Sequence, residues 1–280
     1  MASKVKIART FVRSLFNSIS IVWLVTLSLA AITYKYLPFN DPNASDFQNI
    51  ATSPSGRHWL GTDEIGRDLL ARTVAAAQVS LQVGFIVVSM AALIGGTLGL
   101  CAGYFRGKLD SIIMTSNDVL LAFPGLILAL ALVSVLGTSV RNVILALSIV
   151  LTPAFTRVAR ASTMSFTARP FVTAARSMGA NNAQIILGEL VINVGLSILS
   201  YGLAAISIAI LAEGALSFLG LSVPPPTATW GGMIVSGKEV LRDAPHVVLV
   251  PALTMFLTVL SFNSIGEKFR KIVDKRVRQI

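Results

Sequence analysis

The sequence has 280 residues, of which 54% are hydrophobic and only 13% are charged, too little charge to cover a soluble protein of this length. The composition therefore predicts an all-α polytopic membrane protein. The formal net charge of +10 does not indicate nucleic-acid binding, because the basic residues lie in short loops and tails rather than among aromatic residues. With Cys101 as its single cysteine, the chain can form neither an internal disulfide nor a cysteine-based metal cluster.

The first predicted span covers about residues 15–32 and follows a basic N-terminal tail. Its length approaches the roughly 20 residues that cross a bilayer, and Tyr34 and Tyr36 at its end suit the membrane interface. A cleaved signal peptide is the alternative for this stretch, and the sequence does not decide whether the helix is retained. Residues 1–78 are expected to hold the tail, this helix and an extracytoplasmic segment.

The extracytoplasmic segment contains a run from His58 to Asp68 with the sequence His-Trp-Leu-Gly-Thr-Asp-Glu-Ile-Gly-Arg-Asp. Its clustered acids and lone histidine raise the alternative of a hydrolytic or metal site. A single imidazole without a second histidine at ligand spacing disfavours a metal. Asp63 and Asp68 are instead expected to cap or begin short helices.

Five further spans are predicted, at about residues 79–104, 112–136, 143–158, 192–216 and 247–265. In the first of them, Gly95, Gly99 and Gly103 repeat every four residues, which allows another helix to pack closely. Pro124 should kink the next span. The five spans form the predicted helical core.

A moderately polar stretch between the fourth and fifth of the six predicted spans carries the clearest functional signal. Pro170 can open a short helix, Gly179 can close it in a left-handed cap, and Asn181 can cap a second helix. The small side chains in between would let another protein's surface come close. A docking helix fits this pattern, and an ordinary helix end is the alternative. The candidate docking residues are Phe171, Thr173, Ala174, Ala175, Arg176, Ser177, Gly179 and Ala180.

This stretch resembles the cytoplasmic coupling loop of ABC importer permeases, in which Glu-Ala-Ala is followed by three residues, Gly, about nine more residues and Ile-x-Leu-Pro. The chain departs from that pattern at four positions. Thr173 stands where the family usually has Glu. Glu189, Val191 and Ile192 stand where it has Ile, Leu and Pro.

Two more stretches, residues 58–68 and 217–231, resemble segments of dipeptide, oligopeptide and nickel importer permeases. The resemblance covers about residues 55–270 and implies a C-type permease with six transmembrane helices in a bacterial or archaeal inner membrane. It implies a related B-type permease, two ATPase subunits and an extracytoplasmic substrate-binding protein as partners. It also implies no catalytic, cofactor or metal site in this chain. Because the sequence contains no Gly-x-x-x-x-Gly-Lys-Ser/Thr loop, ATP hydrolysis is assigned to the partners.

Orientation follows from the distribution of Lys and Arg over the six predicted spans. The side that holds both termini and the coupling loop carries 16 of these residues, and the other side carries 7. Both termini and the loop are therefore expected in the cytoplasm, where ATP is available. The predicted divisions are residues 1–78, a core of 79–270 with a coupling loop at about 163–190, and a basic tail of 271–280.

The resemblance implies a mechanism in which closure of the ATPases moves the loop at residues 170–187 and opens a pathway between two permeases. Asp118 and Glu213 are candidate pathway residues, since ionisable residues inside spans are commonly functional. Helix capping or extension to water at a span end is the simpler interpretation. An ion-coupled secondary transporter and a membrane-embedded enzyme are the rival classes. The substrate is interpreted as a peptide, and nickel chelates, glutathione or haem are the alternatives.

Overall fold

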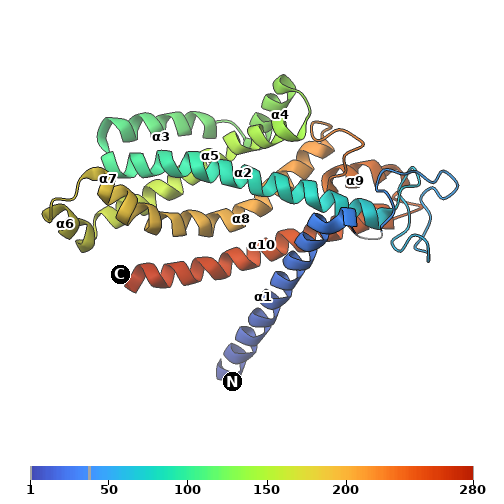
Figure 1. Cartoon of the computed structure of the whole chain (residues 1–280), viewed down its shortest axis with the longest axis horizontal. Helices are drawn as coiled ribbons and strands as arrows, with labels where there is room; N and C mark the ends of the chain where they lie inside the picture. Colours follow the sequence, from blue (N-terminus) through green and yellow to red (C-terminus); the bar gives the residue numbers. More distant parts are fainter. Residues whose placement is uncertain (1, 37–38, 280) are drawn as a thin grey trace. The chain divides into compact units, whose positions relative to one another are not determined.

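The computed structural model describes residues 2–36 and 39–279. Over those ranges the backbone is almost wholly helical, and extended pairing is confined to two isolated bridges, Ser45 with Arg67 and Thr62 with Asp68. Figure 1 colours the helices in chain order. They are α1 (Ala2–Thr33), η1 (Tyr34–Tyr36), α2 (Leu69–Phe105), α3 (Gly107–Leu121), α4 (Gly125–Leu136), α5 (Val140–Thr167), α6 (Pro170–Ser177), α7 (Asn182–Gln184), the π-helix η2 (Ile185–Leu190), α8 (Val191–Phe218), α9 (Trp230–Ser236), η3 (Gly237–Val240) and α10 (His246–Gln279).

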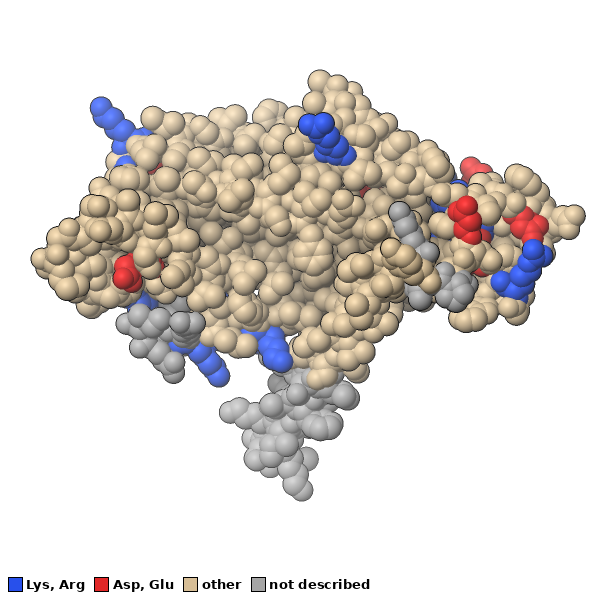
Figure 2. All heavy atoms as spheres, in the orientation of Figure 1, with Lys and Arg blue, Asp and Glu red and all other residues tan. Residues whose placement is uncertain are grey.

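Length and hydropathy identify five stretches within the described residues that can cross a membrane, and a sixth if the bent pair α3–α4 counts as one. The five are Phe16–Thr33, Leu69–Phe105, Val140–Thr167, Asn182–Phe218 and His246–Val273. Figure 2 shows that most of the visible surface carries neither acidic nor basic side chains. The predicted all-α, polytopic membrane fold is confirmed.

The third predicted span differs from the expectation of one kinked helix. The chain forms two helices, α3 and α4, whose axes are bent by 85° at a break before Gly125. Pro124 occupies the break, and the residue before a proline is disfavoured in the helical region, so α3 ends before Phe123. The kink prediction was therefore wrong in degree, because the proline separates two helices rather than bending one.

Four helices extend well beyond the stretches that hydropathy marked. α1 begins at Ala2 rather than near residue 15. α2 begins at Leu69 rather than near residue 79, and α5 continues to Thr167 rather than ending near 158. α10 runs to Gln279, through the residues predicted as a basic tail. Polar residues continue each helix past its apolar part, so the helix is longer than its hydrophobic stretch.

The chain forms two compact units, within each of which the residues mostly contact one another. One comprises Met1–Phe85, Val133–Val143 and Ile206–Ile265, and the other Ile86–Leu132, Ile144–Ala205 and Gly266–Ile280. Helices α2, α4, α5, α8 and α10 contribute residues to both units.

In the second unit, the glycine face of α2 packs directly on α5. A Cβ at Gly95 would lie 2.5 Å from the carbonyl oxygen of Thr152, and a Cβ at Gly103 would lie 2.8 Å from that of Arg160. A Cβ at Gly99 would meet the backbone of α5 at Thr156. Neither helix backbone can yield to a side chain, so the predicted close approach is confirmed and its partner is α5.

In the first unit, the stretch 217–231 folds around Trp230. This side chain is fully buried, and its indole N–H donates to the Thr73 carbonyl oxygen at 3.2 Å. A Cβ at Gly231 would lie 2.6 Å from the Cα of Gly214 on α8. The tryptophan and the glycine of this motif therefore fasten the start of α9 to α2 and α8.

Candidate functional site

The predicted docking helix is α6, and local chemistry fixes both of its ends. Pro170 occupies its first turn, where a proline costs no hydrogen bond. Gly179 has φ +89°, the left-handed conformation expected of a glycine cap. The N–H of Ala180 donates to the Ala175 carbonyl at 3.0 Å, and the N–H of Gly179 donates to the Arg176 carbonyl at 3.1 Å. These two bonds form a Schellman motif, so the turn after α6 has one defined shape.

The next helical segment starts with a complete capping box. The Asn181 side chain accepts from the N–H of Gln184 at 2.9 Å, and the Gln184 side chain accepts from the N–H of Asn181 at 2.8 Å. The Tyr104 hydroxyl, at the end of α2, donates to the Asn182 side chain at 2.7 Å. The π-helix Ile185–Leu190 follows and continues into α8. The loop is therefore joined without interruption to a membrane-spanning helix.

An apolar cluster supports the loop from within. Its buried members come from α5, α6, the π-helix and α8, and they are Ala159, Phe166, Val172, Ile185, Leu190 and Val194. Half-buried apolar residues pack around them: Tyr104, Phe171, Ala175, Ala180, Ile186 and Ile198. Three candidate docking residues, Phe171, Ala175 and Ala180, therefore pack against the chain's own core. Only tertiary contacts distinguish Ala175 from its neighbour Ala174, so the sequence could not separate them.

The remaining candidate docking residues point away from the cluster and are exposed: Thr173, Ala174, Arg176, Ser177 and Gly179. We call this set the outward face of the loop. Two apolar side chains that sequence reasoning missed are exposed beside it, Met178 at 82% and Leu187 at 68%. Met178 directly precedes the glycine cap, where a large apolar side chain has no helical turn to cover it. That position is the signal that could have identified it.

Two ion pairs join α3 to α5. Arg160 binds Asp110 through two hydrogen bonds, of 2.5 Å and 2.7 Å. Arg157 binds Asp118 at 2.7 Å. Both arginines lie inside α5, which extends to Thr167 although the predicted span ended near residue 158. The Asp118 carboxylate therefore pairs with a neighbouring helix, and its side chain stays 60% exposed.

Glu213, the other candidate pathway residue, is buried in α8 with 1% of its surface exposed. Its Oε1 accepts from the Ser217 hydroxyl at 2.9 Å and from the Ser222 hydroxyl at 2.8 Å. Extension to water is therefore wrong for this residue. Glu213 instead fastens the loop after α8 to the helix end. The two serines also border a cavity of about 250 Å³ that Arg72 helps to line.

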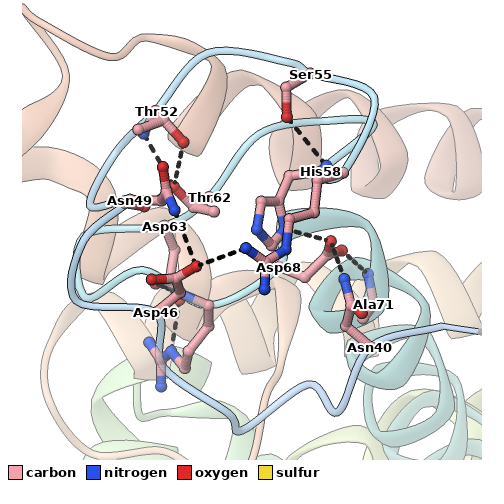
Figure 3. Close-up of polar contacts among 12 residues, drawn as sticks. Asn40, Asp46, Asn49, Thr52, Ser55, His58, Thr62, Asp63, Asp68 and Ala71 are labelled. Carbon is pink, nitrogen blue, oxygen red and sulfur yellow. Dashed lines mark hydrogen bonds and ion pairs between the residues drawn. The ribbon is translucent and has the colours of Figure 1, made fainter.

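The run from His58 to Asp68, predicted to be extracytoplasmic, is held by buried charges (Figure 3). One Asp63 oxygen accepts from the backbone N–H groups of Ile65 and Arg67 at 3.1 Å and 2.9 Å. The other faces the guanidinium Nε of Arg67 at 2.6 Å and of Arg72 at 3.2 Å. Asp63 therefore organises a turn and two arginines and caps no helix. Burial, reinforced by the neighbouring Asp63 charge, raises the pKa of Glu64.

Asp68 caps a helix, as predicted, and also contacts two side chains of the same segment. One of its oxygens accepts from the N–H of Ala71 at 2.9 Å, which caps α2. The other lies 2.8 Å from Nδ1 of His58 and accepts from the Asn40 side chain at 3.0 Å (Figure 3). No group of three or more acidic, histidine or cysteine side chains suited to a metal occurs in the described part of the chain. The acids and the histidine of this run hold the segment together.

Comparisons with known proteins agree with these motifs. The family model described as "Binding-protein-dependent transport system inner membrane component" matches residues 95–279. The chain is 39% identical to the glutathione transport system permease protein GsiD of Pectobacterium atrosepticum, over 91% of this chain and 86% of that protein. It is also 39% identical to GsiD of Escherichia coli O6:K15:H31, over 96% and 89% of the two chains.

Solved structures show the same fold at low sequence identity. A chain of the MetNI methionine ABC transporter in an inward-facing conformation matches with a TM-score of 0.58 and 14% identity, over 73% of this chain and 97% of that one. A chain of an amino acid ABC transporter crystallised with histidines matches with a TM-score of 0.54 and 16% identity, over 75% and 95%.

Proposed function

The chain belongs to the family of binding-protein-dependent transport system inner membrane components and is an ABC importer permease of the peptide/nickel type, and from that premise we propose that it imports peptides or peptide-like compounds. In this proposal it acts as the C-type subunit beside a related B-type permease. Two ATPase subunits and an extracytoplasmic binding protein complete the complex.

The observation that carries the coupling role is the division of the loop into two sides. Apolar side chains on one side pack into the cluster with α5 and α8, and the outward face presents small and polar groups. An ATPase surface could contact Thr173, Ala174 and Ser177 at close range, since none has a long side chain. A displacement of α6 would pass directly to α8, because the π-helix joins the loop to that helix. The exposed Met178, at the end of α6, would add an apolar contact with the ATPase.

The substrate proposal is a peptide, with glutathione as the second candidate. Glutathione is favoured by one observation, the 39% identity to permeases named for glutathione transport. Both compounds are short, hydrated molecules with amide, ammonium and carboxylate groups, so one pathway could pass either. The binding protein would then make most of the selection. Competition by dipeptides, tripeptides and glutathione for uptake into proteoliposomes containing the complete complex separates the two candidates.

Substitution of Ala174 tests the coupling role. Ala174→Trp should reduce co-purification of the ATPase subunits and ATP-driven uptake, because the bulky ring would occupy the contact surface. Insertion and thermal stability should stay near those of the parent, since Ala174 is exposed. Ala174→Ser, which stays small, is the matched control. Full ATPase binding and uptake by the Trp variant would contradict the docking role of the outward face.

Labelling of single cysteines tests the proposed orientation, in which both termini and the loop face the cytoplasm. In a Cys101→Ser background, Ser53→Cys should react with an impermeant thiol reagent in intact cells, and Ser177→Cys should react only after lysis. Both positions are exposed. Ser222 would be a poor outer probe, because its side chain is buried against Glu213. The reverse labelling pattern would overturn the orientation and the coupling assignment together.

A further inference from the structure

We infer that one face shared by α3 and α5 lines the aqueous translocation pathway, with the Asp118–Arg157 ion pair at its centre. This inference rests on the proposed transport function and assigns the lining to particular residues. The two side chains are bonded at 2.7 Å, yet they remain 60% and 53% exposed. Asp118 is the twelfth residue of α3, and Arg157 precedes the end of α5 by ten residues. At 1.5 Å per residue, each lies roughly 15 Å along its helix from the loop-side end, within a stretch long and apolar enough to cross a membrane.

The surroundings of the pair on α3 are polar. Ser111 and Thr115 precede Asp118 at helical spacing and are exposed on the same face. Ile112 and Val119 are also exposed, about 70–95° around the helix from the centre of that polar row at 3.6 residues per turn, and Ser116 is exposed beyond them. The exposed side of α3 is therefore mixed, with hydroxyl and carboxylate groups in a row beside two aliphatic side chains.

α5 continues the polar surface. Ala161 and Ser165 follow Arg157 at intervals of four residues, and all three are exposed. The ion pair joins this row to the polar row of α3. Both rows lie in the same compact unit, so the contact between them is part of one folded body.

Lipid is a poor occupant for this shared face. Hydrocarbon cannot form the remaining hydrogen bonds of a charged pair or of hydroxyl groups. Charged side chains within a membrane therefore face water or protein. The exposed face of the first candidate span has another composition. The exposed large side chains of the first span are all aliphatic or aromatic, and they include Ile19, Val22, Val25, Leu29 and Ile32. Water and a hydrated substrate match the α3–α5 face, because the pair stays exposed after both partners have bonded.

Cysteine accessibility in the complete transporter tests this inference. Thr115→Cys and Ala161→Cys would be made separately in the Cys101→Ser background, with Val25→Cys on the exposed face of the first candidate span as the control. A small charged methanethiosulfonate reagent would be applied to membrane vesicles, and its incorporation measured on this chain after separation from the other subunits. The two polar-face cysteines should react at least 10-fold faster than the control. Their rates should change when ATP and vanadate trap the complex.

Two other occupants predict different results. If a second permease buries the face, all three cysteines should react equally slowly, both without nucleotide and in the trapped state. If lipid covers the face, Thr115→Cys should react as slowly as Val25→Cys after the complex is dissociated in lipid vesicles. Either result would overturn the inference. Uptake by the Cys101→Ser parent separates this outcome from failure of the proposed function, since import without polar-face labelling would reject only the pathway lining.

Discussion

The predicted extracytoplasmic segment, residues 39–68, and the proposed coupling loop, residues 170–190, are both short and irregular, but different forces hold them. Buried carboxylates organise the outer segment. Asp63 joins two arginines and a backbone turn, and Asp68 joins His58 to the start of α2. The coupling loop has an apolar cluster beneath it, and its polar bonds are exposed caps. Ion pairs and hydrogen bonds are directional and hold individual atoms in place, whereas apolar packing is not directional. A loop that rests on an apolar cluster can therefore tilt as one body while its caps stay intact. The second arrangement suits a segment that must transmit movement.

Removal of an outer carboxylate should have the largest effect. Asp63→Ala would leave Arg67 and Arg72 buried without their shared partner, and loss of one member of a buried pair costs about 3–5 kcal/mol. We expect a large loss of thermal stability for the purified chain in detergent, measured by size-exclusion chromatography after heating. Glu64→Gln is the control, because Glu64 contacts Arg67 from a more exposed position and should have a much smaller effect. Equal stability of the Asp63→Ala variant and the parent would show that the ion network does not hold the segment.

Truncation of the apolar support should weaken the coupling loop next. Leu190 is fully buried in the cluster, and replacement of such a side chain by alanine costs about 2–5 kcal/mol. Leu190→Ala should therefore increase hydrogen exchange of amides in residues 170–190 and lower ATP-driven uptake. Amides of the outer segment should keep the exchange rates of the parent. Leu187→Ala is the matched control, since that leucine is 68% exposed and adds little to the cluster. Equally faster exchange in both segments would contradict the view that the apolar cluster holds only the coupling loop.

Local chemistry made parts of both segments predictable. The helix ends in the loop are specified by the backbone and side-chain bonds of Pro170, Gly179 and Asn181. The sequence therefore predicted where the short helices of the loop start and stop. The glycine row at positions 95, 99 and 103 likewise predicted a close helix contact. The family was identifiable because three motifs occur in order along the chain.

Tertiary contacts decided what the sequence could not. Ala174 and Ala175 are identical residues, yet only Ala175 packs into the core. Hydropathy at Glu213 suggested a polar helix end, but two serine hydroxyls from the following residues bury the carboxylate. The partner of Asp118 lies 39 residues away on another helix, so no local pattern reveals the ion pair.

Strain in the turn should affect coupling more than folding. Gly179 has φ +89°, and no atom lies within 4 Å of the position that a Cβ would occupy, so a side chain there meets strain but no clash. Gly179→Val should cost roughly 1–2 kcal/mol and lower substrate-stimulated ATP hydrolysis and uptake, while Gly179→Ala should be milder. Gly188→Ala is the matched control, because its surroundings are equally open and it has no positive φ. Unchanged ATPase stimulation in the Val variant would mean that the turn is not constrained.

The capping box should give the smallest effect, and it separates loss of one hydrogen bond from loss of shape. Asn181→Ala removes the side-chain acceptor for the N–H of Gln184 and should cost about 0.5–1 kcal/mol, the low part of the range for such caps, because the site is exposed. Asn181→Asp keeps an acceptor in place and should retain nearly all of that stability. If the loop works as one body, the Ala variant should hydrolyse more ATP per imported substrate than the Asp variant, since a frayed start of α7 would weaken the connection between α6 and α8. Reconstituted complexes with purified ATPases and binding protein allow both rates to be measured together. Identical ratios for the two variants would show that the apolar cluster alone carries the movement, and that the capping box contributes only local stability.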